Sequence, residues 1–384
     1  MAKNIDIPDG WEVKKLGEVG KIIGGGTPDT KIDKYWSNNT EKNSIIWLTP
    51  TEITNKYTTD SIRKITLQGL NRSSAKILPI NTILITTRAT IGAISIAKIE
   101  CTTNQGFQSL VCNHKYVDYE FMYYMLHQHI NTLKKLANGS TFMEISANEI
   151  RKIKLILPPL AEQEKIAEIL SLWDKAIEQT RQLILYKEKQ KKGLMQNLLT
   201  GRKRLNGWND KWKTVKLGEI CNITTGRLDA NAMEENGVYP FFTCAKDIFK
   251  INTFAFDTEA LLISGNGANV GYIHYYYGKF NAYQRTYVLS NFNEYIIFLK
   301  YYLENYLHIR IDKEKKTGNT PYITLDTISK MSLHIPQYQN EQKAIADILC
   351  KADEEIELLN KQLDLYTEQK KGLMQNLLTG RVRV

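Results

Sequence analysis

Two identical copies of one thirteen-residue segment restrict the fold of this chain more than any other feature. QKKGLMQNLLTGR occupies residues 190–202 and returns unchanged at 369–381, an offset of 179 residues. The same offset relates EQEKIAEIL at 162–170 to EQKAIADIL at 341–349. Self-similarity that persists at one offset indicates a tandem duplication. We therefore expect two copies of one architecture rather than one continuous domain.

The front of each half repeats with a different spacing. WEVKKLGE at 11–18 aligns with WKTVKLGE at 212–219, an offset of 201 residues, whereas Gln105 and Gln284 already follow the offset of 179. The difference between the two offsets places about 22 additional residues in the first half, roughly between positions 27 and 82. A chain of 384 residues is long enough to build more than one core.

Each half consists of a variable segment followed by a long helical region. The variable segments contain short strand-like runs, clusters of turn residues and one apolar helical run each, which favours α/β (α+β) domains. Prolines mark the exits from these segments, because proline is tolerated at the start of a helix but not in its interior. The predicted organisation is a first domain at 1–157, a helical region at 158–204, a second domain at 205–336 and a second helical region at 337–384.

Apolar residues recur at alternating intervals of three and four along both helical regions, which is the heptad pattern of a coiled coil. This seam includes Ile166, Leu170, Trp173, Ile177, Leu194 and Leu198 in the first region and Ile345, Leu349, Ile356, Leu363, Leu373 and Leu377 in the second. Lys370 departs from the pattern in the second region, and Lys187 and Lys191 make the first region less apolar.

So narrow an apolar stripe requires a partner helix. Each region predicts a helix of roughly forty residues, about 60 Å long at 1.5 Å per residue. The nearest partner is the duplicate helix, and an antiparallel pair would place one domain toward each end and relate the halves by a pseudo-twofold axis. We expect this antiparallel coiled coil. The alternative is that the seam pairs with helices of another protein.

The composition favours a polyanionic partner. The chain has 51 basic and 41 acidic residues, a net charge of +10 and a pI near 9.1. It contains no apolar run of roughly eighteen residues and no signal peptide, so neither membrane insertion nor secretion is expected. Its five scattered cysteines form no CxxC pair, which favours reduced thiols in a cytosol over disulfides or a zinc site.

No catalytic motif is recognisable. SGNGANVG at 264–271 contains GxGxxxG, but the following residues resemble a strand, so no helix N-terminus is available for a phosphate and a β-turn is the better interpretation. The sequence contains no P-loop, no NPPY motif of amino-methyltransferases and no HExxH. We therefore expect no catalytic residue, metal or cofactor in this chain.

Several short motifs recur in a fixed order along the chain. They are W…KLGE at 11–18 and 212–219, GGGTP at 24–28, KYW at 34–36, IIWLTPTEI at 45–53, NQ at 104–105, YQR at 283–285, G-S/N-T at 139–141 and 318–320, PPLAEQEKIAEIL at 158–170, and LLTGR at both helix ends. Their order, spacing and duplication resemble the DNA-specificity subunit of type I restriction-modification systems. The resemblance covers essentially the entire chain.

The resemblance implies a non-catalytic, DNA-associated protein of the prokaryotic cytoplasm. In that family two target-recognition domains read the halves of a bipartite, asymmetric DNA sequence, and an antiparallel coiled coil sets the spacer between them. The helices, with their ends at 190–202 and 369–381, would dock two adenine-methyltransferase subunits that bind S-adenosylmethionine. Restriction and translocase subunits would join through these partners.

Polar residues in turn-like stretches are the candidates for contact with DNA bases, since arginine pairs with guanine and asparagine or glutamine with adenine. They are Thr27, Lys34, Trp36, Arg88, Thr90 and Gln105 in the first domain and Arg227, Asn266, Asn269, Gln284 and Arg285 in the second. The matched residues Gln105 and Gln284 are less suited to discriminate, because two domains with different targets share them. For each candidate, a solvated loop residue is the alternative.

Two other functions remain open from the sequence. The chain could be the recognition module of a single-site methyltransferase or of a type IIB-like system, with the same DNA role and different partners. It could also be a coiled-coil scaffold that never contacts DNA.

Overall fold

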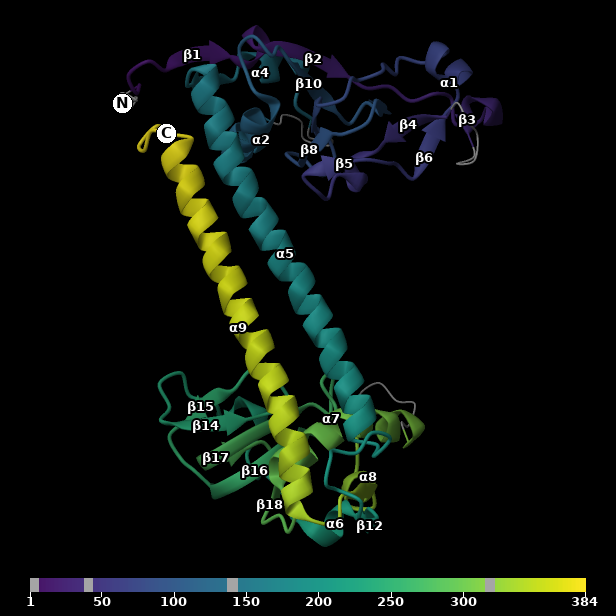
Figure 1. Ribbon diagram of the computed structural model, residues 1–384, viewed down its shortest axis with the longest axis vertical. Helices are drawn as coiled ribbons and strands as arrows, with labels where there is room; N and C mark the ends of the chain where they lie inside the picture. The colour runs from purple at the N-terminus through teal and green to yellow at the C-terminus, as the bar shows by residue number, and fades with distance from the viewer. Residues whose placement is uncertain (1–6, 38–43, 137–143, 315–321) are drawn as a thin grey trace. The chain divides into compact units, whose positions relative to one another are not determined.

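The chain divides into two compact units (Figure 1). Unit 1 comprises Met1–Gln179 together with Leu363–Val384, and unit 2 comprises Thr180–Gln362. The computed structural model describes residues 7–37, 44–136, 144–314 and 322–384, so the repeated motifs at 139–141 and 318–320 lie outside the described residues. Each unit therefore combines one variable domain with parts of both helical regions.

Within its described residues, unit 1 contains three sheets. A two-stranded antiparallel sheet joins β1 (Glu12–Lys15) to β11 (Lys154–Leu157), so the two ends of the variable domain lie together. The five-stranded sheet has the order β2-β10-β7-β8-β5, with bounds Gly20–Gly24, Gln108–Cys112, Ile83–Ile85, Ile94–Ala97 and Tyr57–Thr58. The four-stranded sheet has the order β3-β6-β4-β9, with bounds Trp36–Ser37, Arg63–Ile65, Ile45–Leu48 and Cys101–Thr103.

The core of unit 1 lies between the five-stranded sheet and helix α2 (Tyr119–Gln128). Every residue of β7 and β8 is buried, as short runs rich in isoleucine favour. Asp118 caps α2 by accepting a hydrogen bond from the Phe121 backbone amide at 2.8 Å. Three further helices complete the described part of the domain: α1 (Leu67–Asn71), α3 (Ile130–Leu136) and α4 (Ala147–Lys152).

The additional residues of the first half form most of the four-stranded sheet. Strands β3, β4 and β6 all fall between positions 36 and 65, inside the interval where the sequence predicts the insertion. Trp47 and Ile65 are buried in a small separate cluster on this sheet. The insertion is thus a folded lobe with its own apolar cluster.

Unit 2 repeats the two-stranded sheet that joins the two ends of the variable domain, but the strand order of its larger sheet differs from that of unit 1. β12 (Lys213–Lys216) pairs with β19 (Ser332–Ile335) as β1 pairs with β11. One six-stranded sheet has the order β13-β18-β16-β17-β14-β15, with bounds Asn222–Thr225, Thr286–Ser290, Phe256–Ser264, Ile273–Ala282, Tyr239–Phe242 and Phe249–Ile251. The helices are α6 (Leu217–Ile220), α7 (Ile296–Glu314) and α8 (Leu325–Ser329).

The glycine-containing segment SGNGANVG connects two antiparallel strands of this sheet. β16 and β17 pair from Phe256↔Phe280 to Ile263↔Ile273, so the segment forms the loop of a hairpin. Gly267 and Gly271 take φ angles of 80° and 84°, which glycine adopts without strain. The prediction of a turn between strands is confirmed.

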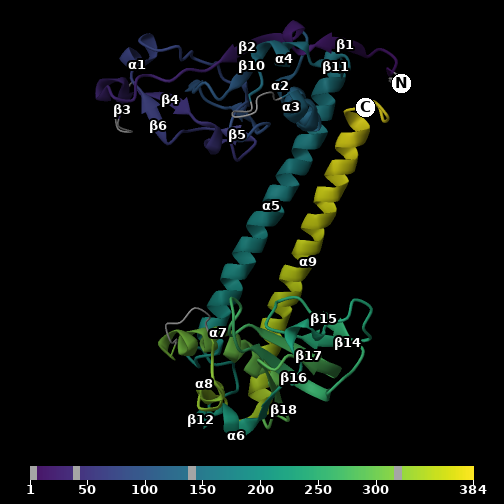
Figure 2. The same ribbon diagram turned by 180° about the vertical axis from the view of Figure 1, so that it is seen from behind.

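Two helices of 39 residues each, α5 (Leu160–Leu198) and α9 (Gln339–Leu377), carry the predicted heptads. In unit 1, Glu162 pairs with Arg383 and Asp174 pairs with Lys370. In unit 2, Lys187 pairs with Glu355 and Lys191 with Asp353. Residue numbers rise along α5 as they fall along α9, so the helices run antiparallel in both units, side by side in both views (Figures 1 and 2).

The predicted fold class is confirmed: two tandem α/β domains alternate with two long helices that pair antiparallel. This alternation of domains and helices follows from the duplication. Each half of the chain repeats a two-stranded sheet that joins the ends of its domain, a larger sheet and a long helix. None of the described helices combines the length and apolar character needed to cross a membrane.

Candidate nucleic-acid interface

Three loops of unit 1 meet where strands β2 and β7 end and strand β10 begins, at the same end of the five-stranded sheet. They are residues 25–28 after β2, residues 86–92 after β7 and residues 104–107 before β10, and we call them loop cluster 1. The Gly26 amide donates to the Thr103 carbonyl at 2.8 Å, and the Thr87 amide donates to the Gly106 carbonyl at 2.8 Å. A Cβ at Gly25 would lie 2.0 Å from the Asn104 carbonyl oxygen, so the close approach requires glycine.

Loop cluster 1 brings together four of the six candidates of the first domain. The Thr27 hydroxyl donates to Gln105 Oε1 at 2.5 Å, and the Thr90 hydroxyl donates to the Pro50 carbonyl at 3.2 Å. Arg88 forms an ion pair of 2.6 Å with Glu144, although its side chain remains 44% exposed. Arg88 would have to exchange this carboxylate for a phosphate or a base to contact DNA.

The other two candidates lie on the inserted lobe. Lys34 is exposed in a 3₁₀ turn at Asp33–Tyr35, and Trp36 begins β3. The Trp36 ring meets Trp47 edge to face with centroids 4.9 Å apart, and the Arg63 guanidinium lies 3.6 Å from the Trp36 ring centroid. Sequence reasoning missed Arg63, because only the pairing of β3 with β6 places it over Trp36. The two tryptophans in KYW and IIWL were the available signal for this aromatic platform.

Unit 2 assembles an equivalent loop cluster 2 from residues 226–229, 243–245, 265–271 and 283–286. A Cβ at Gly226 would lie 1.9 Å from the Ala282 carbonyl oxygen. The Gly265 amide donates to the Arg285 carbonyl at 2.9 Å. All five candidates of the second domain belong to these loops, so the structure brings them together.

The candidates of loop cluster 2 differ in whether their side chains already form hydrogen bonds within the domain. The Asn269 amide donates to the Cys244 carbonyl at 3.1 Å, and the Gln284 amide donates to Asp229 at 2.8 Å. The backbone of Asn266 bridges to Tyr322. Arg227 and Arg285 are exposed and form no ion pair within the described part of the chain. Exposed arginines of this kind can bind phosphates or guanine edges.

The helix residues predicted as a seam are covered rather than presented to solvent. Ile166, Leu170, Ile177, Leu198, Ile345, Leu349 and Leu377 are buried, and Trp173, Leu194, Ile356, Leu363 and Leu373 are partly buried. Large apolar side chains outside the seam are instead exposed: Leu172, Leu183, Leu185 and Tyr186 on α5, and Leu358 and Leu365 on α9. These six are therefore better placed than the seam to contact another protein.

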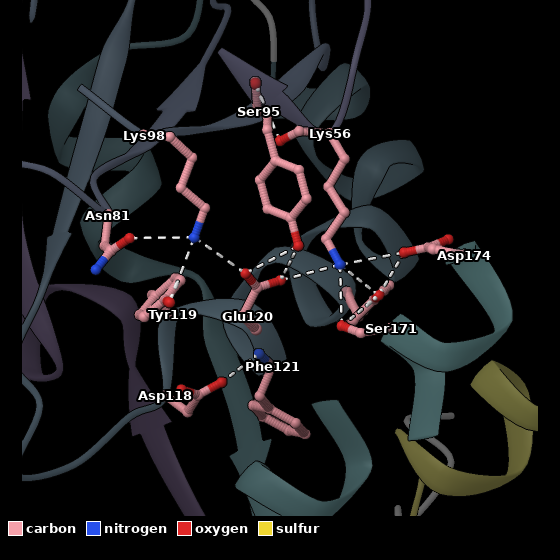
Figure 3. Close-up of polar contacts among 12 residues, drawn as sticks. Lys56, Asn81, Ser95, Lys98, Asp118, Tyr119, Glu120, Phe121, Ser171 and Asp174 are labelled. Atoms are coloured by element: carbon pink, nitrogen blue, oxygen red, sulfur yellow. Dashed lines mark hydrogen bonds and ion pairs between the residues drawn. The ribbon is translucent and has the colours of Figure 1, made fainter. Parts of the chain in front are cut away.

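A dense polar cluster joins the domain of unit 1 to α5, where Lys56 approaches Ser171 and Asp174 (Figure 3), and it extends to Lys370 of α9. Asp174 of α5 accepts hydrogen bonds from Lys370 of α9 and from the Tyr124 hydroxyl of α2. Lys56 lies 3.1 Å from the Asp174 carboxylate and 2.9 Å from the Glu120 carboxylate. Sequence reasoning missed this cluster, although the off-pattern Lys370 was a signal for it.

The charges of this cluster are mutually supporting. Burial raises the pKa of Asp174, but the hydrogen bonds from Lys370 and Tyr124 outweigh it and hold the pKa below its ordinary value. Burial lowers the pKa of Lys56, but its hydrogen bonds and the charges around it outweigh that effect and raise the pKa. Asp174 and Lys56 are thus both charged at neutral pH.

The described residues contain no group of three or more His, Cys, Asp or Glu side chains that could hold a metal ion. Burial raises the pKa of the Cys101, Cys112 and Cys221 thiols to about 12, so these three remain protonated at neutral pH.

Comparisons with known proteins point to one family. The family model described as type I restriction modification DNA specificity domain matches residues 8–185 and 209–365. The type I restriction enzyme MjaIX specificity subunit of Methanocaldococcus jannaschii is 28% identical, over 98% of this chain and 95% of that protein. The EcoDI specificity subunit of Escherichia coli is 41% identical, over 44% of this chain and 37% of that protein.

Solved structures share the fold. The S subunit of a type I restriction-modification system from M. genitalium superposes with a TM-score of 0.66 at 20% identity, over 98% of both chains. A chain from a structure that reports complex assembly and conformational transition of the type I R-M system superposes with a TM-score of 0.62 at 19% identity, over 98% of this chain and 100% of the other.

Proposed function

The chain belongs to the type I restriction-modification DNA specificity family, and we propose that each of its variable domains reads one half of a bipartite, asymmetric DNA target. The observation that carries this proposal is the pair of loop clusters. They occupy equivalent places in the two repeats, yet they present different side chains. A duplicated scaffold with two different sets of exposed polar groups is suited to two different short sequences.

The charge of the clusters supports contact with DNA and an asymmetric target. Loop cluster 2 presents Arg227 and Arg285 without a carboxylate partner in the described residues, whereas Arg88 of loop cluster 1 is paired with Glu144. Arginine recognises guanine through O6 and N7, and exposed lysine and arginine neutralise phosphates. Gln105 and Gln284 each form a hydrogen bond within their own cluster, to Thr27 and Asp229, which suits a role in shaping the loops.

The partners follow from the same proposal. Catalysis would reside in two methyltransferase subunits, which bind S-adenosylmethionine, and in restriction and translocase subunits that join through them. Identical partners require equivalent surfaces on the two repeats. Tyr186 of α5 and Leu365 of α9 are equivalent under the 179-residue offset and are 61% and 57% exposed. We assign partner contact to these exposed helix residues in place of the covered seam.

Sequencing of modified bases tests the proposal. The chain is co-expressed with the methyltransferase subunit encoded in the same genome, and methylated adenines are mapped across the host DNA. The expected pattern is two short defined sequences separated by a gap of unspecified bases. The control omits this chain and should show no methylation. A single contiguous motif, or methylation that persists without this chain, would contradict the proposal.

A further inference from the structure

Lys191 and Lys370 occupy seam positions of the coiled coil, where apolar residues are the rule. Each lysine reaches an aspartate on the opposite helix. Lys370 of α9 donates to Asp174 Oδ1 of α5 in unit 1, and Lys191 of α5 donates to Asp353 Oδ1 of α9 at 2.5 Å in unit 2. The side chains of Lys191 and Lys370 are only 20% and 21% exposed, so an unpaired ammonium at either position would be costly.

A tyrosine of the variable domain completes each pair. Asp174 Oδ2 accepts from the hydroxyl of Tyr124 in α2, and Asp353 Oδ2 accepts from the hydroxyl of Tyr301 in α7 at 2.6 Å. One carboxylate therefore joins three elements in each unit: the domain helix, α5 and α9. Burial and the hydrogen bond to Asp353 raise the pKa of Tyr301, so its hydroxyl remains a donor at neutral pH.

We propose that the two Tyr–Asp–Lys clamps, Tyr124–Asp174–Lys370 and Tyr301–Asp353–Lys191, position the recognition domains by selecting one register of α5 against α9. The positioning would determine which spacer length the protein accepts between the two half-sites. This inference rests on the function proposed above. It assigns the spacer preference to specific side chains.

Physical chemistry gives a reason for polar clamps in an apolar seam. A seam of leucine and isoleucine retains apolar contacts when one helix slides by a heptad, about 10 Å along the axis, or changes its local register. A half-buried lysine does not tolerate such a shift, because it would lose its carboxylate and face apolar side chains. A single polar seam position is known to specify register at a cost in stability.

The two clamps specify the same register. Asp174 and Lys191 are 17 positions apart on α5, and Asp353 and Lys370 are also 17 positions apart on α9. A slide of α5 against α9 would therefore break both clamps, so each adds to the free energy that favours this register, and the loss of either one lowers it. Since both clamps specify one register of α5 against α9, we attribute the accepted spacer length to that register.

The clamp of unit 1 is reinforced by the insertion. Lys56 Nζ lies 3.1 Å from Asp174 Oδ2 and donates to the Tyr124 hydroxyl at 2.6 Å and to Ser171 at 3.1 Å (Figure 3). In unit 2 the residue equivalent to Ser171 is Cys350, which accepts from Tyr301 at 3.6 Å. Replacement of Asp174 would leave two lysines without this carboxylate, so the clamp of unit 2 is the cleaner site for an experiment.

The test uses the full chain with its methyltransferase partner and the target found by sequencing. Methylation is measured on duplexes that keep both half-sites and vary the spacer one base pair at a time. The double variant Lys191→Leu with Asp353→Leu replaces one partly buried ion pair by two apolar side chains, which often preserves or increases stability. We expect its preference for the native spacer over neighbouring lengths to fall at least about tenfold, while base preference within each half-site is unchanged.

A matched control and a second variant keep the test decisive. Lys330→Ala with Asp326→Ala removes an exposed ion pair of 2.6 Å between α8 and the residue that follows it, and should leave the spacer preference unchanged. If the double leucine variant does not fold, Asp353→Asn is judged by the same criterion. A folded variant with the wild-type spacer preference overturns the clamp proposal. A wild-type protein without any bipartite target instead overturns the proposed function, so the two failures are distinguishable.

Discussion

Arg383 holds the Glu162 carboxylate at two points, with 2.7 Å to Nε and 2.8 Å to Nη2. Arg204 holds Glu341 in the same manner, at 2.9 Å and 3.0 Å. The two carboxylates lie in the first turns of α5 and α9. In unit 2 the arginine belongs to the continuous linker between α5 and β12, whereas in unit 1 it belongs to the last residues of the chain. The duplication thus extends to the bidentate arginine–glutamate pair at the first turn of each long helix.

Replacement of Arg383 by methionine should lower the thermal stability of the protein and make it less sensitive to acid. The hydrogen bond from Arg383 is the largest contribution that lowers the pKa of Glu162 below its ordinary value of 4.5. A lowered folded-state pKa stabilises the fold above the unfolded-state pKa, and this contribution disappears as the pH falls through the folded-state value.

Thermal melts at pH 7 and below pH 4.5 provide the measurement. The difference in Tm between wild type and Arg383→Met should be present at pH 7 and shrink in acid. Arg381→Met, two residues earlier and exposed, is the control and should melt like the wild type at both values. An equal loss of Tm at both pH values would show that packing rather than charge fastens the helix start.

His127 should make unit 1 sensitive to mild acid. Burial, followed by the positive charge of Lys370, lowers the pKa of His127 to about 4, while the charge of Asp174 opposes this and Lys56 adds to it. Its Nε2 atom is buried and forms no hydrogen bond within the described residues, and its ring contacts Tyr123 with centroids 4.5 Å apart. The unfolded chain therefore binds a proton between about pH 6.5 and 4 that the folded chain does not.

The free energy of unfolding should accordingly decrease as the pH falls through this interval, by at most about 3 kcal/mol from this residue. His127→Met should remove most of that decrease in urea titrations at pH 7 and pH 5. His308→Met changes an exposed histidine and should leave the decrease intact. The interpretation fails if His127→Met retains the full dependence on pH.

Arg285→Ala should relax the sequence preference of the second half-site alone. If the arginine pairs with a guanine, its loss should cost about 1–3 kcal/mol of discrimination at one position. Competition methylation assays on duplexes with single-base changes measure this, and the first half-site should remain as selective as in the wild type. Arg88→Ala should produce the reverse pattern. Uniform weakening across all sequences would mean that the arginine contacts phosphate only.

Gly226→Ala should disorganise loop cluster 2, because the added methyl would lie 1.9 Å from the Ala282 carbonyl oxygen. We expect a loss of roughly 1–3 kcal/mol in the free energy of unfolding, the usual cost of an overpacked site. Gly372→Ala on α9 is the matched control, since a Cβ there meets nothing within 4 Å. This replacement should raise the free energy of unfolding by about 1 kcal/mol, because alanine favours the helix more than glycine does. Urea titration distinguishes the two. Equal stability of both variants would show that the backbone of loop cluster 2 can move aside.

The sequence alone established the duplication, the position of the insertion, the two long helices and the tandem α/β organisation. These features leave one-dimensional signals: a constant offset, a heptad period and prolines at the domain exits. A hairpin loop in SGNGANVG was likewise predictable, because the residues on both sides are strand-like. Burial of Ile166 and Leu349 also follows from their places in the period, since periodicity alone defines which face of a helix is covered.

Only the tertiary structure decided which polar residues meet. Lys370 and Asp174 are 196 positions apart, and the period marked Lys370 merely as an irregular seam residue. The stacking of Arg63 on Trp36 depends on the order of strands β3, β6 and β4, which local propensity does not encode. Local patterns determine secondary structure because their interactions span a few residues. Contacts such as these depend on which distant segments of the sequence the fold brings together, and this is a property of the whole tertiary structure.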